Sequence, residues 1–295
     1  MYRIIRKRKY WYLLSGILLA ASIVAIAVFG LRIGIDYMGG AIIDYRSTNP
    51  EASSIIEGAV RDQGITQYQI KGDENGVTLR TVDLSNETHN KINQVISDKA
   101  PDITENSYDN VGPTVGKDLT NKSILAVIIA SLAIITYIAY SFRKVPKPLS
   151  SWKFGLLAVA ALIHDLVITT GFVAVLGHFF IWMEVDALFI TALLTILGFS
   201  VHDTIVIYDR LRENFIKNPN QGIEVSAEES TTQTLARSIN TSITTIIVLT
   251  ALLLFGGTSI KHFILILIVG IFFGTYSSIF IAAPLIVSWH EQDKR

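Results

Sequence analysis

Two residues of opposite charge stand where a membrane protein could use them to bind and release a proton. Asp203 lies in the segment GFSVHDTIVIYDRLRE (198–213), at the end of an apolar stretch long enough to cross a bilayer as a helix. Arg237 lies at the start of the next apolar stretch. A carboxylate at such depth costs about 2.5–3.5 kcal/mol on insertion scales, so chains keep it mainly where it pairs, lines a wet cavity or carries protons. We therefore expect Asp203 and Arg237 to form an ion pair.

Polar side chains accompany both charges at helical spacing. At about 100° per residue, the polar residues of each stretch fall on one narrow face. They are Ser200, Asp203 and Thr204 on the first stretch, and Arg237, Asn240, Thr241 and Thr244 on the second. Such faces avoid lipid, so we expect the two stripes to face each other or a hydrated seam.

The expected pair has two interpretations. A nearby cation favours the ionised carboxylate, whereas burial without the cation favours the protonated form. Separating the helices would then load a proton and closing them would release it. The alternative is a static salt bridge that holds two helices together. We favour the proton-responsive pair, because ionisable groups inside membranes are functional candidates by default.

A second acid, Asp165, lies near the middle of another apolar stretch, in AALIHDLVIT. It could be a member of a proton relay, or it could be protonated and hydrogen-bonded to a serine or threonine of a neighbouring helix. His164-Asp165 and His202-Asp203 suggest a metal, but adjacent helical residues point about 100° apart and lack the i, i+4 spacing of helical zinc ligands. We expect no metal, and we interpret His202 as a polar neighbour of Asp203 that could also transfer a proton.

Composition places the chain among membrane proteins. Half of its 295 residues are apolar and 17% are charged, against about 25% in soluble domains. Residues 33–122 hold eight Lys/Arg against fourteen Asp/Glu, and this acidic segment argues against nucleic-acid binding. Cysteine is absent. The chain also lacks the nucleotide-binding glycine motifs and an exposed Ser/His/Asp arrangement, so we expect neither a cofactor nor an enzyme.

The apolar stretches predict an α-helical polytopic membrane protein with six transmembrane helices. The expected segments are a basic tail 1–10, helices 11–31, 123–142, 154–177, 187–209, 238–256 and 262–288, a loop 210–237 and a tail 289–295. Fifteen Lys/Arg fall on one side of these helices, against only Lys261 in the short loops of the other. By the positive-inside rule both termini are cytoplasmic, and residues 33–122 form an outer domain.

The outer segment predicts a small α/β domain in the order βαββαβ, which is the ferredoxin-like pattern. Its expected elements are strands at 41–45, 67–71, 77–82 and 103–111, a five-residue turn Gly72–Gly76, a helix from Pro50 to Gly64 capped by Asn49, and a helix from Ser85 to Pro101. His89 is expected to be a lone surface histidine without a ligand role.

Several motifs in order resemble a known family. They are Gly34-Ile35-Asp36-Tyr37-Met38-Gly39-Gly40, Val111-Gly112-Pro113-Thr114-Val115-Gly116, Gly198-Phe199-Ser200-Val201-His202-Asp203-Thr204, Asp209-Arg210-Leu211-Arg212-Glu213-Asn214 and Arg237-Ser238-Ile239-Asn240-Thr241-Ser242. Together with six apolar stretches they resemble the SecF side of the SecD/SecF protein-export family, over nearly the whole chain.

The resemblance implies half of a resistance-nodulation-division fold in the bacterial inner membrane, completed by six helices of SecD. It also implies an accessory role at the SecYEG channel, with YajC as a further partner, in which the proton gradient promotes export of unfolded polypeptides. Asp203 and Arg237 match family residues held to conduct protons. Asp36 matches a motif whose implied role is structural, linking the first helix to the outer domain. The family often has asparagine in place of His202, which leaves the role of this histidine open.

Two other functions remain open at this point. One is half of a proton-coupled exporter of the same superfamily, although the outer segment of about 90 residues is too small for a substrate funnel. The other is an assembly factor that stabilises a translocon partner without moving protons. Sodium could replace the proton, because the same carboxylate could bind it.

Overall fold

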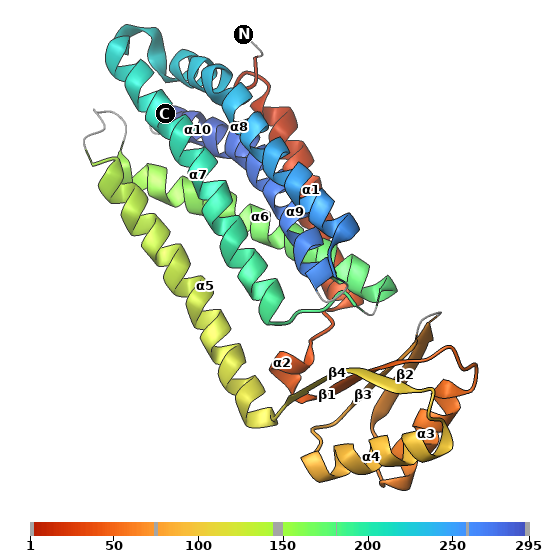
Figure 1. Ribbon diagram of the computed structural model, residues 1–295. Helices are drawn as coiled ribbons and strands as arrows, with labels where there is room; N and C mark the ends of the chain where they lie inside the picture. Colours follow the sequence, from red (N-terminus) through yellow and green to blue (C-terminus); the bar gives the residue numbers. More distant parts are fainter. Residues whose placement is uncertain (1–2, 74–75, 144–149, 181, 258–259, 293–295) are drawn as a thin grey trace. The chain divides into compact units, whose positions relative to one another are not determined.

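The computed structural model describes residues 3–73, 76–143, 150–180, 182–257 and 260–292. The chain divides into two compact units, one formed by Met1–Arg32 with Leu125–Arg295 and the other by Ile33–Ile124. Within the described residues, six helical segments are long and apolar enough to cross a membrane, as predicted. Their elements are α1 (Arg8–Phe29), α5 (Pro113–Ser141), α6 (Ser151–Phe179), α7 (Ala187–Lys217), α8 (Gly222–Phe255) and α9 (Lys261–Ser277), the last continued by a π-helical turn (Ser278–Ala282) and α10 (Ala283–Gln292) (Figure 1).

Helix α9 is the centre of the first unit, because it packs against α6, α7 and α8, while α1 packs against α6. Small residues allow the closest approaches. A Cβ at Gly274 of α9 would lie 3.0 Å from the Cβ of Ser200 on α7, and a Cβ at Gly171 of α6 would lie 2.4 Å from the Cβ of Ser22 on α1. Glycine at these two positions therefore brings backbones together so that short polar side chains can meet.

The N-terminal residues close one end of this unit. Ile4 and Ile5 are buried in an apolar cluster that includes Phe154 and Tyr208, whose rings make an edge contact at 4.9 Å. The carboxylate of Glu228 accepts hydrogen bonds from the backbone N–H groups of Ile4 (2.6 Å) and Ile5 (2.9 Å). A buried charge needs such donors, since an unpaired carboxylate in an apolar core is costly.

Residues 210–237, expected to be a loop with a short surface helix, are helical over nearly their whole length. Helix α7 continues to Lys217, a 3-10 turn covers Pro219–Gln221, and α8 begins at Gly222 (Figure 1). The segment is polar, but its small and apolar residues recur every three or four positions and are buried; these are Ile223, Ser226, Ala227, Ser230, Thr231 and Thr234. A hydrogen bond from Asn214 Nδ2 to Ser230 Oγ (2.8 Å) joins the two helices. Hydroxyl groups that bond backbone carbonyls of their own helix let such a sequence pack as a helix.

The second predicted boundary that differs is that of α5. This helix begins at Pro113, about ten residues before the predicted start, and its first turns up to Ile124 belong to the second compact unit. Proline suits a first helical turn, where its missing N–H leaves no bond unmade. The ends of the other long helices differ from the predicted ones by about one turn.

The second unit contains a four-stranded antiparallel sheet in the order β2-β3-β1-β4. Its elements are α2 (Ile35–Met38), β1 (Gly40–Arg46), α3 (Ala52–Asp62), β2 (Tyr68–Asp73), β3 (Gly76–Thr81), α4 (Asn86–Lys99) and β4 (Thr104–Val111). The predicted cap of the second helix is confirmed, because Ser85 Oγ accepts from the N–H of Thr88 at 3.1 Å. The strands extend to Asp73 and Gly76, and residues 74–75 of the predicted turn lie outside the described residues.

The interpretation of His89 as a lone surface residue is also wrong. Its ring stacks on Tyr108 at 3.7 Å between centroids, and its Nε2 lies 2.8 Å from Glu105 Oε2. Tyr45, 3% exposed, donates a hydrogen bond of 2.9 Å to Asn93 beside this group. Sequence periodicity did not reveal that α4 lies over the strands at this position, where the ring is 12% exposed.

Candidate functional site

Asp203 occupies the buried side of α7, with only 6% of its surface exposed. Its Oδ2 accepts a hydrogen bond of 3.3 Å from Thr275 Oγ1 of α9. Its Oδ1 lies 3.8 Å from Nδ1 of His202, whose side chain is 59% exposed. The acid therefore lies between a neutral hydroxyl and a histidine that reaches the surface of the unit.

The predicted ion pair with Arg237 is absent, although the structure describes both residues. Arg237 is exposed on α8, and it has no ion pair with a described residue. The next residue, Ser238, is buried together with Ser242, which hydrogen-bonds Thr275 of α9. Because successive helical residues differ by about 100°, the face that packs on α9 turns Arg237 outward.

The two polar stripes consequently do not face each other. Asn240 and Thr241 share the exposed side of α8 with Arg237, and Thr241 Oγ1 donates back to the Arg237 carbonyl at 2.9 Å. The stripe of α7 faces α6 and α9 instead. Thr204 Oγ1 lies 2.8 Å from Ser278 Oγ, within hydrogen-bonding distance. The alternative of a hydrated seam for the α8 stripe stays a prediction.

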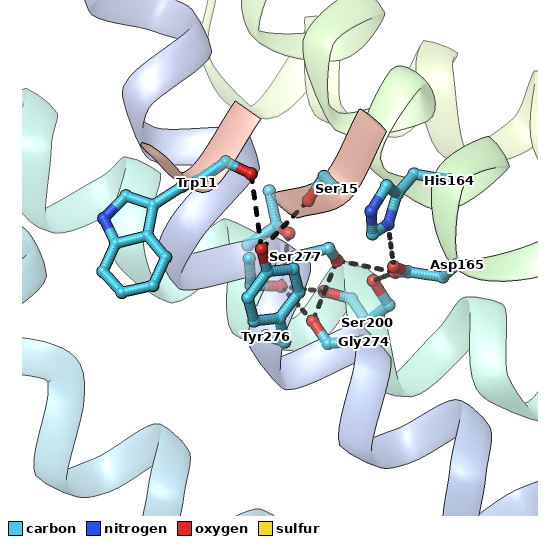
Figure 2. A network of polar contacts seen from close by, with 10 residues as sticks. Trp11, Ser15, His164, Asp165, Ser200, Gly274, Tyr276 and Ser277 are labelled. Carbon is cyan, nitrogen blue, oxygen red and sulfur yellow. Dashed lines mark hydrogen bonds and ion pairs between the residues drawn. The ribbon is translucent and has the colours of Figure 1, made fainter. Parts of the chain in front are cut away.

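The second acid, Asp165, is the most enclosed charge of the unit, with none of its surface exposed. Its Oδ2 accepts hydrogen bonds from Ser200 Oγ of α7 (2.6 Å) and Ser277 Oγ of α9 (2.7 Å). Its Oδ1 lies 3.0 Å from Nδ1 of His164, which precedes it on α6. Figure 2 shows these three side chains directed at the carboxyl group. Three helices thus meet at one acid, and the serine partners that one alternative predicted are present, while its protonation and the relay role stay predictions.

The network continues from Asp165 toward α1. The ring of His164 stacks on that of Tyr276 at 6.2 Å between centroids. Tyr276 Oη lies 3.0 Å from Ser15 Oγ of α1, and it also donates a weaker bond of 3.5 Å to the carbonyl of Trp11 (Figure 2). Polar groups of α1, α6, α7 and α9 are therefore linked through the interior of the unit.

Helix α9 supplies the hydroxyl groups for both acids immediately before its geometry changes. Thr275 donates a hydrogen bond to Asp203 and Ser277 donates one to Asp165. The π-helical turn starts at the next residue, Ser278. Insertions of π-helix often mark functional sites. Carboxyl groups held only by hydroxyl groups and histidine can exist protonated or ionised without breaking an ion pair. This arrangement is suited to binding and releasing a cation as small as a proton.

Three of these hydroxyl groups, those of Thr275, Ser277 and Ser278, were not among the candidate site residues predicted from the sequence. The available signal is three hydroxyl residues within four positions of an otherwise apolar stretch. Polar residues in membrane helices form hydrogen bonds across helices where they meet a partner. Such a cluster therefore predicts hydrogen bonds to the acids of neighbouring helices.

Comparison with known proteins identifies similar chains. Residues 91–292 match the family model described as "Protein export membrane protein SecD/SecF, C-terminal". A protein translocase subunit SecF from Thermobaculum terrenum is 40% identical, in an alignment covering 99% of this chain and 95% of that protein. The SecF of Haemophilus influenzae is 34% identical, with 94% and 83% covered.

Longer proteins contain a similar region. The protein translocase subunit SecDF of Bacillus subtilis is 34% identical over 96% of this chain and 37% of its own length. The crystal structure of SecDF, a translocon-associated membrane protein from Thermus thermophilus, superimposes with a TM-score of 0.84 and 28% identity, covering 98% of this chain and 39% of that one. This chain therefore spans about two fifths of those fused proteins.

Proposed function

Because this chain belongs to the SecD/SecF family of protein export membrane proteins, we propose that it is the SecF-type accessory subunit of the Sec translocation machinery. In this function it acts with SecD and uses the proton gradient to promote the export and release of polypeptides across the cytoplasmic membrane. The observation that carries the gradient dependence is the buried carboxylate of Asp203 in a membrane helix, which accepts a hydrogen bond from Thr275 and has no ion pair with a lysine or arginine among the described residues.

Arg237 supports a function that requires a partner. Lipid is a costly environment for a guanidinium group inside a membrane helix. Its exposed position on α8, beside the exposed Asn240 and Thr241, is accounted for if this stripe faces a hydrated seam against SecD. SecDF proteins that carry both parts in one chain favour the same partner. In this proposal Asp203 and Arg237 both take part in proton coupling in the assembled complex without forming an ion pair within this chain. His202 lies beside the acid, and Ser200 and Thr204 belong to the polar network around it.

The remaining parts of the proposal concern location and partners. We place both termini in the cytoplasm and Ile33–Ile124 outside, where a ferredoxin-like domain would contact the emerging chain. The expected partners of the chain are SecD, the SecYEG channel and YajC. The membrane is the bacterial inner membrane, because only there does a proton gradient act on exported polypeptides. A potential of 100 mV supplies about 2.3 kcal/mol for each charge moved, which is enough to bias a conformational cycle.

Export into membrane vesicles tests this function. The complex is made with wild-type chain, with Asp203→Asn and with Asp209→Asn, a matched control on the same helix whose carboxylate is exposed and pairs with Arg212 at 2.8 Å. We expect the gradient to stimulate export with the wild type and the control, and not with Asp203→Asn.

Equal stimulation with Asp203→Asn would exclude proton coupling through this acid and would favour the assembly factor. Copurification of the complex with an outer-membrane duct in place of the export channel would favour the exporter. Stimulation that follows a sodium gradient in place of a proton gradient would identify sodium as the coupling ion.

A further inference from the structure

Asp165 and its serine partners can satisfy their hydrogen bonds in two different protonation states. Ser277 has a single hydroxyl hydrogen but two acceptors, Asp165 Oδ2 at 2.7 Å and the Gly274 carbonyl at 3.1 Å. When the carboxyl group is ionised, Ser277 donates to it. When a proton adds to Oδ2, the new O–H can donate to Ser277 Oγ, and Ser277 turns its own hydrogen to Gly274. Only the added O–H bond is formed, and no buried polar atom of the pair loses its partner.

A second hydroxyl group transmits the change into the π-helical turn. Ser278 Oγ donates to the Gly274 carbonyl at 2.9 Å or to the Ser200 carbonyl at 3.1 Å. If the Ser277 hydroxyl group donates to the Gly274 carbonyl, the Ser278 hydroxyl group can donate to the Ser200 carbonyl of α7 instead. The state of Asp165 on α6 can therefore alter the hydrogen bonds between α9 and α7 at the residue where the π-helical turn begins, where Thr204 Oγ1 of α7, 2.8 Å from Ser278 Oγ, is a further partner.

His164 carries the ring nitrogen of this group that can accept a further hydrogen. Because a carboxylate only accepts, Nδ1 of His164 carries the hydrogen toward Asp165 Oδ1, and Nε2 is then an acceptor. Nε2 is buried and has no hydrogen-bond partner among the described residues. The titratable side chain in contact with Asp165 is His164 of its own helix, whose ring stacks on Tyr276 of α9, while α7 and α9 present the hydroxyl groups of Ser200 and Ser277 to the acid.

We propose that Asp165 and His164 form a second proton-binding site, distinct from Asp203, in which proton uptake rearranges the Ser277 and Ser278 hydroxyl groups at the π-helical turn. Only the use of this site in export rests on the proposed function, because this chain alone would bind the proton at Asp165. A proton that binds at Nε2 of His164 lets the hydrogen on Nδ1 pass to Asp165 Oδ1, and a half turn of the carboxyl group then presents the new O–H to Ser277; the reverse sequence releases the proton.

Infrared difference spectra of the full chain in lipid nanodiscs, recorded between neutral and acidic pH, test the proposal. A protonated carboxyl group gives a separate carbonyl band. We expect Asp165→Asn to remove one band that Asp203→Asn retains. Ser277→Ala keeps the acid but removes a hydrogen-bond partner, so it should shift the frequency of that same band.

A spectrum unchanged by Asp165→Asn, or a band that Ser277→Ala does not move, would overturn the second site. If Asp165→Asn fails to fold, as judged by circular dichroism and gel filtration, the Ser277→Ala shift alone decides. Loss of gradient-dependent export in Asp203→Asn concerns the proposed function only, so the two failures are distinguishable.

Discussion

Thr275 of α9 donates a hydrogen bond of 3.3 Å to the carboxylate of Asp203 on α7. The acid of the fourth membrane helix is thus held by a neutral hydroxyl group and not by the guanidinium group of the following helix. A neutral partner leaves both protonation states of the acid accessible, whereas a buried ion pair would be costly to break. In the proposed function, this neutral contact allows the acid to change its charge as the complex moves.

The approach of α1 to α6 depends on Gly171. In Gly171→Ala the new Cβ would lie 2.4 Å from the Cβ of Ser22 and 2.6 Å from its Cα, so the helices must separate. We expect the free energy of unfolding to fall by about 1–3 kcal/mol, as overpacking does in other cores. Thermal unfolding in detergent measures it.

Gly198→Ala is the matched control, because a Cβ there meets nothing within 4 Å on α7. It should leave stability unchanged or raise it by up to about 1 kcal/mol through helix propensity. Equal effects of the two substitutions would show that the α1–α6 contact is not close.

The N-terminal residues are held by Glu228. Glu228→Gln removes the charge that accepts the backbone N–H groups of Ile4 and Ile5, and hydrogen bonds to charged groups contribute about 1.5–3 kcal/mol. We expect faster amide hydrogen exchange at these two residues. Glu224→Gln is the control, since its side chain is 42% exposed and lies 3.9 Å from Arg8; unchanged exchange in Glu228→Gln would contradict the anchor.

Tyr45 makes the stability of the second unit, Ile33–Ile124, depend on alkaline pH. Burial, with a smaller contribution from Glu105, raises the pKa of Tyr45 well above its ordinary value. A pKa that is higher in the folded state means that the stabilisation is complete below about pH 10, the unfolded value, and is lost as pH rises further. Tyr45→Phe loses the bond to Asn93, about 1 kcal/mol at neutral pH, but it has no proton to lose. Thermal unfolding should show that Tyr45→Phe is less stable than the wild type at pH 7 and that this difference in stability is smaller at pH 11. The same difference at both pH values would refute this dependence.

Long-range periodicity predicted the membrane helices and the strand order along the chain, because burial on one face follows from residue types alone. Short hydroxyl residues carried less information. Ser277 serves an acid 112 positions away, and only the packing of α9 between α6 and α7 brings the two together. The same limit explains the wrong pairing of Asp203 with Arg237, since the sequence shows the face on which each residue lies but not the neighbour that this face meets.

In the polar segment between α7 and α8, composition was misleading about the secondary structure. Its serines and threonines predict a loop by composition, yet Ile223 and Ala227 keep helical spacing and are buried. The buried charge of Glu228 gave no sequence signal either, because its partners are backbone N–H groups of residues 4–6, which no side-chain pattern reveals.

Proton flux through liposomes that contain this chain together with its SecD partner is the most direct measurement of proton coupling at Asp203. With an imposed pH difference, the wild-type complex should carry protons, and Asp203→Asn should abolish the flux while the complex still assembles. Flux of equal rate in the wild type and in Asp203→Asn would contradict a proton-carrying role for this acid.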